Sequence, residues 1–241
     1  MPGPVALVGS GEFIEVMEPV DASLLAGRPP RAVFLPTAAA PDGPDRVDYW
    51  VDLGTRHFEK LGVEPVALRV LDREDAERPE LASAVKGAGL VYLSGGNPGY
   101  LADTLRGTAV WRAVLEAFAA GAALAGCSAG ACALGAVSED FRHPGRYSGL
   151  GLGVVPGVAT IPHFDRLARY VPGVEERILA TAPPSVEVLG IDEETALVGG
   201  PERFRVAGRR SVWRLAKDAT RTRHDAGDEL VLPPYRGPGA G

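Results

Sequence analysis

The chain has 241 residues, 46% of them hydrophobic, which is enough for one sizeable α/β core. Acidic residues outnumber basic ones by 31 to 25, so the net charge of −6 gives no general attraction for nucleic acid or an anionic membrane surface. No stretch approaches the roughly 20 apolar residues of a membrane span and the N-terminus lacks the basic segment of a secretory signal, so we predict a cytoplasmic protein with a small or peptide-like ligand.

Short apolar runs in the first 70 residues predict buried strands. Each run ends at turn-forming residues, and the runs cover 4–9, 31–37 and 64–70. Apolar residues recur at helical spacing over 44–62, and Gly62 ends that pattern. The alternation of strands and helices predicts an α/β fold with a doubly wound, mostly parallel sheet and helices on both faces.

The middle of the chain continues this alternation. A strand is predicted at about 88–94, and a helix of about three turns follows between Thr108 as N-cap and Gly121. The next segment predicts a strand of small residues, a turn at Cys127–Ser128 and a helix that begins near Ala129.

The last third of the chain has a different pattern. Beyond about residue 183, closely spaced apolar runs with glycine turns predict antiparallel strands added near the C-terminus. We predict one α/β hydrolytic domain over 1–234 and a flexible tail over 235–241. Cys127 and Cys132 are too close in sequence for a framework disulfide and are expected to be reduced.

The stretch GCSAGA, residues 126–131, has the G-x-S-x-G pattern of a nucleophile turn between a strand and a helix. Gly126 and Gly130 leave room for a sharp bend, which lifts Ser128 out of the carboxyl edge of the sheet beside a helix N-terminus. A small residue in a tight corner would give the same pattern. The order of strand, turn and helix favours the nucleophile.

A second glycine turn, within LSGGNPGYL at 93–101, follows the preceding strand and ends at the same sheet edge. Backbone N–H groups of Gly96 or Asn97 could join that of Ala129 in an oxyanion hole. Taken alone, this segment also fits an ordinary loop.

A serine nucleophile needs a base, and the chain has four histidines. His57 lies within a helical pattern and is expected to be solvated, whereas His143 lies in a polar loop and could contact substrate. His163 follows an apolar run in GVATIPHFDR, where a strand end would face Ser128, and is favoured. His224 lies in a highly charged segment that predicts a loop or hairpin tip.

An acidic turn between two apolar strands, in VEVLGIDEETALVGG, offers the third member of a triad. Asp192, Glu193 or Glu194 could accept the histidine N–H, although acidic clusters at such turns are often solvated. An alternative order combines Ser128 and Asp192 or Glu193 with His224, as in α/β hydrolases.

Two other classes of function remain open. The chain could be a non-catalytic ligand-binding protein that keeps the turn for packing. It could also be a glutamine amidotransferase that uses Cys127 as nucleophile. Cys127 precedes the apex of the turn, however, so its side chain is expected to point away from the cavity. GSGEF, residues 9–13, lacks the full spacing of a dinucleotide motif. No zinc motif is present, so no metal or cofactor is expected.

Five ordered motifs together resemble the serine peptidase family that contains dipeptidase E and cyanophycinase. They are GSGEF, LSGGNPGYL, GCSAGA, GLGLGVVPGVATIPHFDR and LGIDEETALV, and they span about residues 4–215. The resemblance implies a class I glutamine amidotransferase-like fold in which serine replaces the cysteine nucleophile. It also implies a serine-type peptidase with a short peptide substrate. A homodimer is compatible with the sequence, and no nucleic-acid or membrane partner is expected.

Carried over by position, the resemblance implies Ser128 as nucleophile, His163 as base and Glu193 as the orienting acid. Asp192 and Asp140 are the alternatives for the acid. Gly96 and Ala129 are implied at the oxyanion site.

The substrate contacts are less well defined by the sequence. We predict that Asn97, Arg166 and His143 contact substrate, and Arg142 and Arg146 are further candidate cations for an acidic substrate group. The segment after His163 departs from the arginine-rich run of cyanophycinase by inserting Pro172 and Gly173. The peptide preferred therefore stays open.

Overall fold

The computed structural model describes the chain except residues 139, 141–142, 144, 219 and 234–241, and it leaves out the side chains of 168–170. Within the described residues, eight strands form a main sheet in the order β12-β9-β8-β1-β5-β4-β2-β3. The five strands from β1 to β3 in that order are parallel, and β8, β9 and β12 are added antiparallel at one side. Their bounds are β1 Val5–Val8, β2 Arg31–Leu35, β3 Glu64–Ala67, β4 Leu90–Leu93, β5 Ala123–Cys127, β8 Thr195–Gly199, β9 Arg203–Gly208 and β12 Glu229–Val231.

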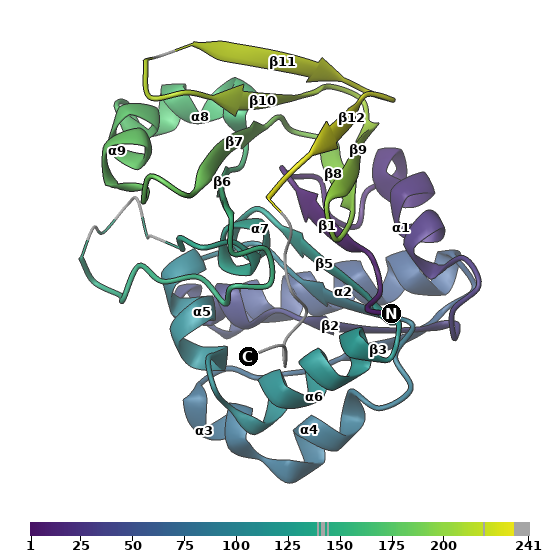
Figure 1. Cartoon of the computed structure of the whole chain (residues 1–241). Coiled ribbons are helices and arrows are strands. Elements are labelled where there is room, and N and C mark those ends of the chain that lie inside the picture. The colour runs from purple at the N-terminus through teal and green to yellow at the C-terminus, as the bar shows by residue number, and fades with distance from the viewer. Residues whose placement is uncertain (139, 141–142, 144, 219, 234–241) are drawn as a thin grey trace.

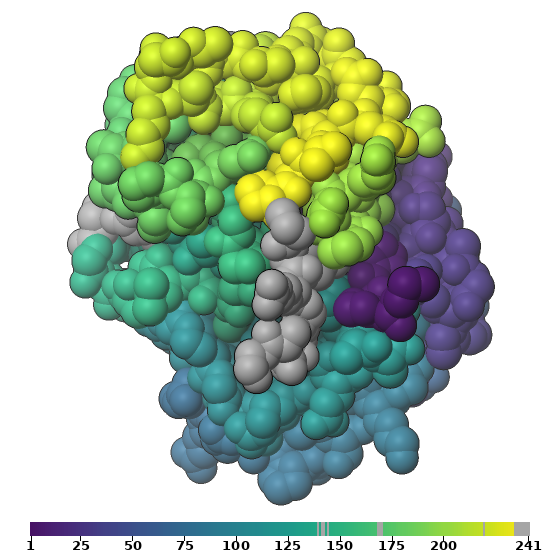
Figure 2. Space-filling model, in the orientation of Figure 1, coloured from purple at the N-terminus to yellow at the C-terminus, as the bar shows by residue number. Residues whose placement is uncertain are grey.

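A second sheet lies over one end of the main sheet (Figure 1). Its order is β11-β10-β7-β6, with β6 parallel to β7 and the other pairs antiparallel. The bounds are β6 Val158–Ile161, β7 Glu187–Ile191, β10 Ser211–Leu215 and β11 Arg221–Asp225. Figure 2 shows these green to yellow residues gathered at one end of the molecule, away from the blue residues that precede β4.

Helices cover both faces of the main sheet because successive side chains of its strands point to opposite sides. In β1, Val5 and Leu7 join one hydrophobic cluster, and Ala6 and Val8 join another. The first cluster is completed by α3 to α7 and the second by α1 and α2. The helices are α1 Glu18–Leu25, α2 Pro44–Lys60, α3 Arg73–Glu77, α4 Pro79–Ala84, α5 Pro98–Leu105, α6 Ala109–Ala119, α7 Ala129–Leu134, α8 Phe164–Tyr170 and α9 Val174–Thr181, with 3₁₀ turns η1 Glu15–Met17 and η2 Thr37–Asp42.

The predicted fold class is confirmed, including the antiparallel additions, which divide between the two sheets. Thr108 caps α6 as predicted, since its hydroxyl accepts the Trp111 N–H. The prediction of a loop or hairpin tip at His224 is wrong, because His224 lies within strand β11 and pairs with Val212 of β10. The single domain stays a prediction, and the predicted tail at 235–241 lies outside the described residues. Among the residues described, no helix is both long and apolar enough to cross a bilayer.

His57 also differs from its prediction as a solvated residue, because it is 4% exposed and lies within the core. Its Nε2 lies 2.8 Å from Oδ2 of Asp21, so the pair joins α2 to α1. Burial raises the pKa of Asp21, and the hydrogen bond to His57 partly opposes that change. Two aromatic rings pack against His57: the ring centroid of Phe13 lies 5.5 Å away and that of Phe58 lies 5.1 Å away.

We expect His57→Ala to lower the free energy of unfolding by about 3 kcal/mol, because it leaves the Asp21 carboxyl buried without its partner. Urea denaturation followed by circular dichroism measures the change. The double replacement by leucine is the control. It should lower the free energy of unfolding by less than the sum of the losses in the two single leucine variants. A loss below about 1 kcal/mol for His57→Ala would show that this pair does not help to hold the two helices together.

Candidate active site

Ser128 lies at the apex of a sharp turn between β5 and α7, with φ 52° and ψ −109°. The two flanking glycines make the turn possible. A Cβ at Gly126 would lie 2.4 Å from the backbone of Gly130, and one at Gly130 would lie 2.2 Å from the Leu93 carbonyl oxygen. The Ser128 N–H donates to the Val8 carbonyl. The turn therefore presents the hydroxyl at the carboxyl edge of the parallel strands, where open α/β sheets bind ligands.

His163 reaches Ser128 from the second sheet. It follows β6 and begins α8, and its backbone is in the left-handed region with φ 50° and ψ 34°. Its N–H donates to the Gly9 carbonyl, which ties it to the segment that leaves β1. The side chain then places Nε2 3.0 Å from Oγ of Ser128.

Glu193 completes a chain of three side chains. Its Oε1 lies 3.1 Å from Nδ1 of His163. A carboxylate only accepts, so Nδ1 carries the proton in this contact and Nε2 is left to accept from the Ser128 hydroxyl. The arrangement is that of a nucleophile, a base and an orienting acid.

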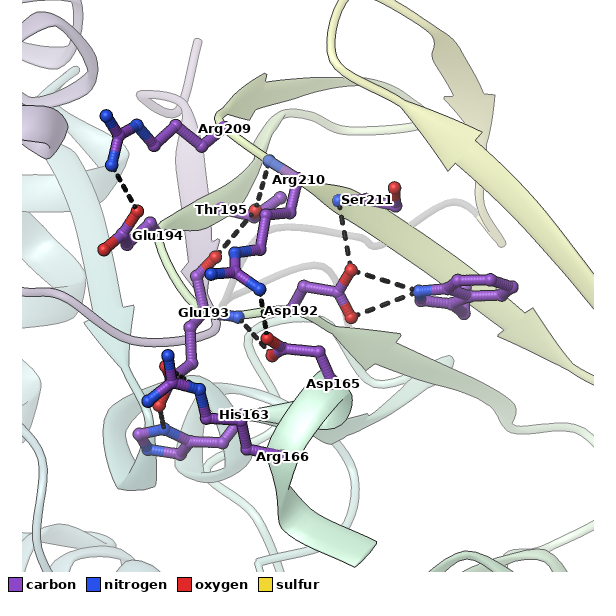
Figure 3. Close-up of polar contacts among 11 residues, drawn as sticks. His163, Asp165, Arg166, Asp192, Glu193, Glu194, Thr195, Arg209, Arg210 and Ser211 are labelled. Carbon is purple, nitrogen blue, oxygen red and sulfur yellow. Dashed lines mark hydrogen bonds and ion pairs between the residues drawn. The ribbon is translucent and has the colours of Figure 1, made fainter.

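Two charged side chains of α8 hold Glu193 (Figure 3). Its Oε2 lies 2.8 Å from Nε of Arg166, and its backbone N–H donates to Oδ1 of Asp165 at 2.9 Å. Asp165 is itself paired with Arg210 at 2.6 Å. Helix α8 thus supplies two neighbouring residues that fix the carboxylate and the backbone of Glu193.

The neighbours of Glu193 point elsewhere. Asp192 accepts from the Trp213 indole N–H at 3.1 Å and from the Ser211 N–H, and burial raises its pKa. Glu194 pairs with Arg209 at 3.1 Å. Of the three acidic residues in this turn, only Glu193 reaches His163.

Asp140, the other alternative acid, lies in a different group. Its Oδ2 accepts from Nδ2 of Asn97 at 2.7 Å and lies 3.1 Å from Nδ1 of His143. Asn97 also caps α5, since its Oδ1 accepts the Tyr100 N–H. Asp140 still lines the cavity beside Ser128, so this group borders the site.

Gly96 and Ala129 line the same small cavity as Ser128, which has a volume of about 140 Å³. Ala129 is the first residue of α7, where a helix has no internal acceptor for the N–H. Gly96 has φ 143°, and a Cβ there would lie 2.2 Å from the Ala38 carbonyl oxygen. Neither N–H donates to an acceptor among the described residues, so both are available to a ligand oxygen.

A larger cavity of about 420 Å³ lies on another side of Ser128 and is also lined by Gly96 and His163. It extends to α2, where the Arg46 guanidinium lies over the rings of Tyr49 and Trp50 at 5.0 and 5.1 Å. No carboxylate of the described residues pairs with Arg46. Arg46 could not be predicted from the sequence, because a lone arginine on a helix carries no local sign that its helix borders the site.

The cationic residues predicted from the sequence either contact other side chains or lie outside the described residues. Arg166 pairs with Glu193, and the Arg146 guanidinium lies 5.4 Å from the Tyr147 ring centroid. Arg142 lies outside the described residues. Substrate contacts of Arg166, Asn97 and His143 stay predictions.

Cys127 is fully buried behind the turn, and its Sγ lies 2.8 Å from Oε2 of Glu12. Burial first, and then the charge of Glu12, raise the pKa of the thiol well above its usual range. The thiol is therefore protonated at neutral pH, and a protonated buried thiol is a poor nucleophile. Among the described residues, no cluster of metal-binding side chains occurs either.

The sequence and the fold are similar to those of known peptidases. A family model described as Peptidase family S51 matches residues 5–206. A peptidase from an acI-B1 Actinobacterium has a crystal structure that is 37% identical, with a TM-score of 0.88 over 96% of this chain and 97% of that one. A putative peptidase E from Listeria monocytogenes is 20% identical with a TM-score of 0.64 over 87% of this chain and all of that one, which shows likeness of fold.

A curated cyanophycinase from Trichormus variabilis is 31% identical over 155 residues. That match covers 59% of this chain and 50% of the cyanophycinase. The chain thus spans about half the length of the curated cyanophycinases that it matches.

Proposed function

Because this chain belongs to peptidase family S51, we propose that it is a serine-type peptidase that hydrolyses short peptides, with Ser128 as nucleophile, His163 as base and Glu193 as orienting acid. One observation carries the proposal. Three side chains from separate parts of the sequence form a continuous chain of contacts of 3.0 and 3.1 Å at the carboxyl edge of the sheet. Such a chain is what a serine hydroxyl needs in order to attack a carbonyl at neutral pH.

In the proposed reaction, Ser128 Oγ attacks the carbonyl carbon of the peptide while His163 Nε2 takes the hydroxyl proton. The C–N bond then breaks as the same proton passes to the leaving nitrogen, and an ester to Ser128 remains. Water attacks this ester, His163 takes a proton from the water, and the Oγ–C bond breaks as Oγ regains a proton. Glu193 stabilises the imidazolium that forms in each half.

The backbone N–H groups of Gly96 and Ala129 would receive the oxyanion in both halves. Both residues line the cavity that contains Ser128, and both N–H groups are free of protein acceptors among the described residues. Amides fixed by the fold need no reorganisation as charge develops, so they favour the tetrahedral state over the bound substrate.

Two cavities that share Ser128 support a short peptide as substrate, because residues on either side of the cleaved bond need separate space. The smaller measures about 140 Å³ and the larger about 420 Å³. The larger one offers the guanidinium of Arg46, which pairs with no carboxylate in the described part of the chain, to a carboxylate of the substrate.

The proposal predicts that a fluorophosphonate labels the protein at Ser128, because this reagent forms a stable adduct with an activated serine hydroxyl. Mass spectrometry of the digested protein locates the adduct. Ser148→Ala is the matched control, since Ser148 is an exposed serine bonded to Asp103, and it should be labelled as fully as the wild type. A folded protein without an adduct at Ser128 would favour a ligand-binding relative instead.

A further inference from the structure

Glu12, in the GSGEF segment, is a buried acidic residue that the proposed reaction does not use. It follows β1 and is 5% exposed. Its neighbour Phe13 has φ 64° and packs into the aromatic cluster, 5.0 Å from Tyr92 between ring centroids. Anchoring of Phe13 fixes the backbone from which the Glu12 side chain extends toward the strand ends.

Both carboxyl oxygens of Glu12 contact segments that lead into the site. Oε1 accepts the Gly95 N–H at 2.8 Å, and Oε2 lies 2.8 Å from Sγ of Cys127. Gly95 directly precedes Gly96, and Cys127 directly precedes Ser128. One side chain therefore joins the two turns that carry the proposed oxyanion donors.

The sheet does not tie these two turns to each other, although β1 holds the second turn through the Ser128 N–H and the Val8 carbonyl. Registered pairing of β4 with β5 ends at Leu93 and Gly126, before either turn begins. Beyond that point, the Asn97 N–H donates to the Ala38 carbonyl at 2.7 Å on one side of the glycine turn, and Glu12 holds Gly95 on the other. A Cβ at Gly95 would lie 2.7 Å from Glu12 Oε1, so the contact also depends on glycine there.

From these contacts we propose that Glu12 is a positioning residue, whose carboxylate sets the Gly95–Gly96 turn against the Cys127–Ala129 turn so that the two oxyanion donors converge. This inference rests on the proposed peptidase function. It gives a role to a buried acidic residue in the wall of the larger cavity, whose contacts are a backbone N–H and a thiol, neither of which carries a charge. A donor displaced by about 1 Å can cost about 10² in rate, which gives the expected size of the effect.

The test compares Glu12→Ala with Glu12→Gln in steady-state peptide hydrolysis. Glu12→Ala removes both contacts and should lower kcat about 10²-fold while KM changes less than about 3-fold, since the donors act in the transition state. Glu12→Gln keeps an oxygen for the Gly95 N–H and should retain kcat within about 5-fold. Glu15→Ala, at an exposed neighbour in η1, is the control and should match the wild type.

Glu12→Asp tests the same proposal if the alanine variant does not fold. It keeps the charge but is one methylene too short to reach both partners, and we expect kcat to fall at least about 10-fold. A folded alanine or aspartate variant with kcat within about 3-fold of wild type would overturn the assignment, as would an equal loss in Glu12→Gln. If the wild type neither hydrolyses peptides nor is labelled at Ser128, the proposed peptidase function fails as well. If only the Glu12 variants differ from expectation, the proposed peptidase function stands and the role of Glu12 is rejected.

Discussion

Replacing Ser128 by alanine is expected to lower kcat for peptide hydrolysis by about 10⁶-fold, the size of effect typical of a lost triad nucleophile. The substitution removes the attacking oxygen while the neighbouring amides of Gly96 and Ala129 stay in place. Residual catalysis of about 10³ to 10⁴ over water is expected from those amides and from binding. The assay would use the best substrate from a set of dipeptides that includes aspartyl, β-aspartyl and arginyl members.

The fold should tolerate this change. The Ser128 side chain makes no capping hydrogen bond to α7, so alanine removes no helix cap. We expect the free energy of unfolding to stay within about 0.5 kcal/mol of the wild type. A stable Ser128→Ala protein that keeps more than about 1% of wild-type kcat would exclude Ser128 as the nucleophile.

The second large effect is expected at His163. His163→Ala should lower kcat by at least about 10³-fold, because the Ser128 hydroxyl loses the base that lies 3.0 Å away. His224→Ala is the matched control and should change kcat less than about 3-fold. His224 lies in β11, opposite Val212 of β10, at the far side of the second sheet.

Backbone conformation calls for a second substitution at position 163. His163 has a positive φ of 50°, a region that asparagine adopts more readily than alanine. His163→Asn should therefore keep the local backbone and still show the loss of activity. Equal losses in His163→Asn and His224→Ala, or a loss in the latter alone, would contradict His163 as the base.

Some features of this protein follow from its sequence because they depend on residues close together in the chain. The G-x-S-x-G pattern predicted the turn at Ser128, and the close contacts of Gly126 and Gly130 give the steric reason. Apolar runs and turn residues likewise predicted β1, β2, β4 and β5 within one or two residues at most ends. His163 could be placed at a strand end, next to the edge where Ser128 emerges.

Other features depend on contacts between distant parts of the chain. The charged sequence of β11 carries no strand pattern, and its pairing partner β10 makes it a strand. His57 has the helical spacing of a surface residue, yet it is buried against Asp21, which lies 36 residues away in sequence. Local periodicity contains neither partner, so both predictions were wrong.

The sequence alone predicts the G-x-S-x-G turn, the parallel core and an acidic segment that holds three of the four candidate carboxylates. Only the tertiary structure distinguished Glu193 among them, because the segment runs from the second sheet to the main sheet and each side chain meets a different partner there. Asp192 accepts a hydrogen bond from Trp213, Glu194 pairs with Arg209, and Glu193 contacts His163. The direction of each carboxylate is set by how the two sheets pack, and no spacing along the chain records that packing.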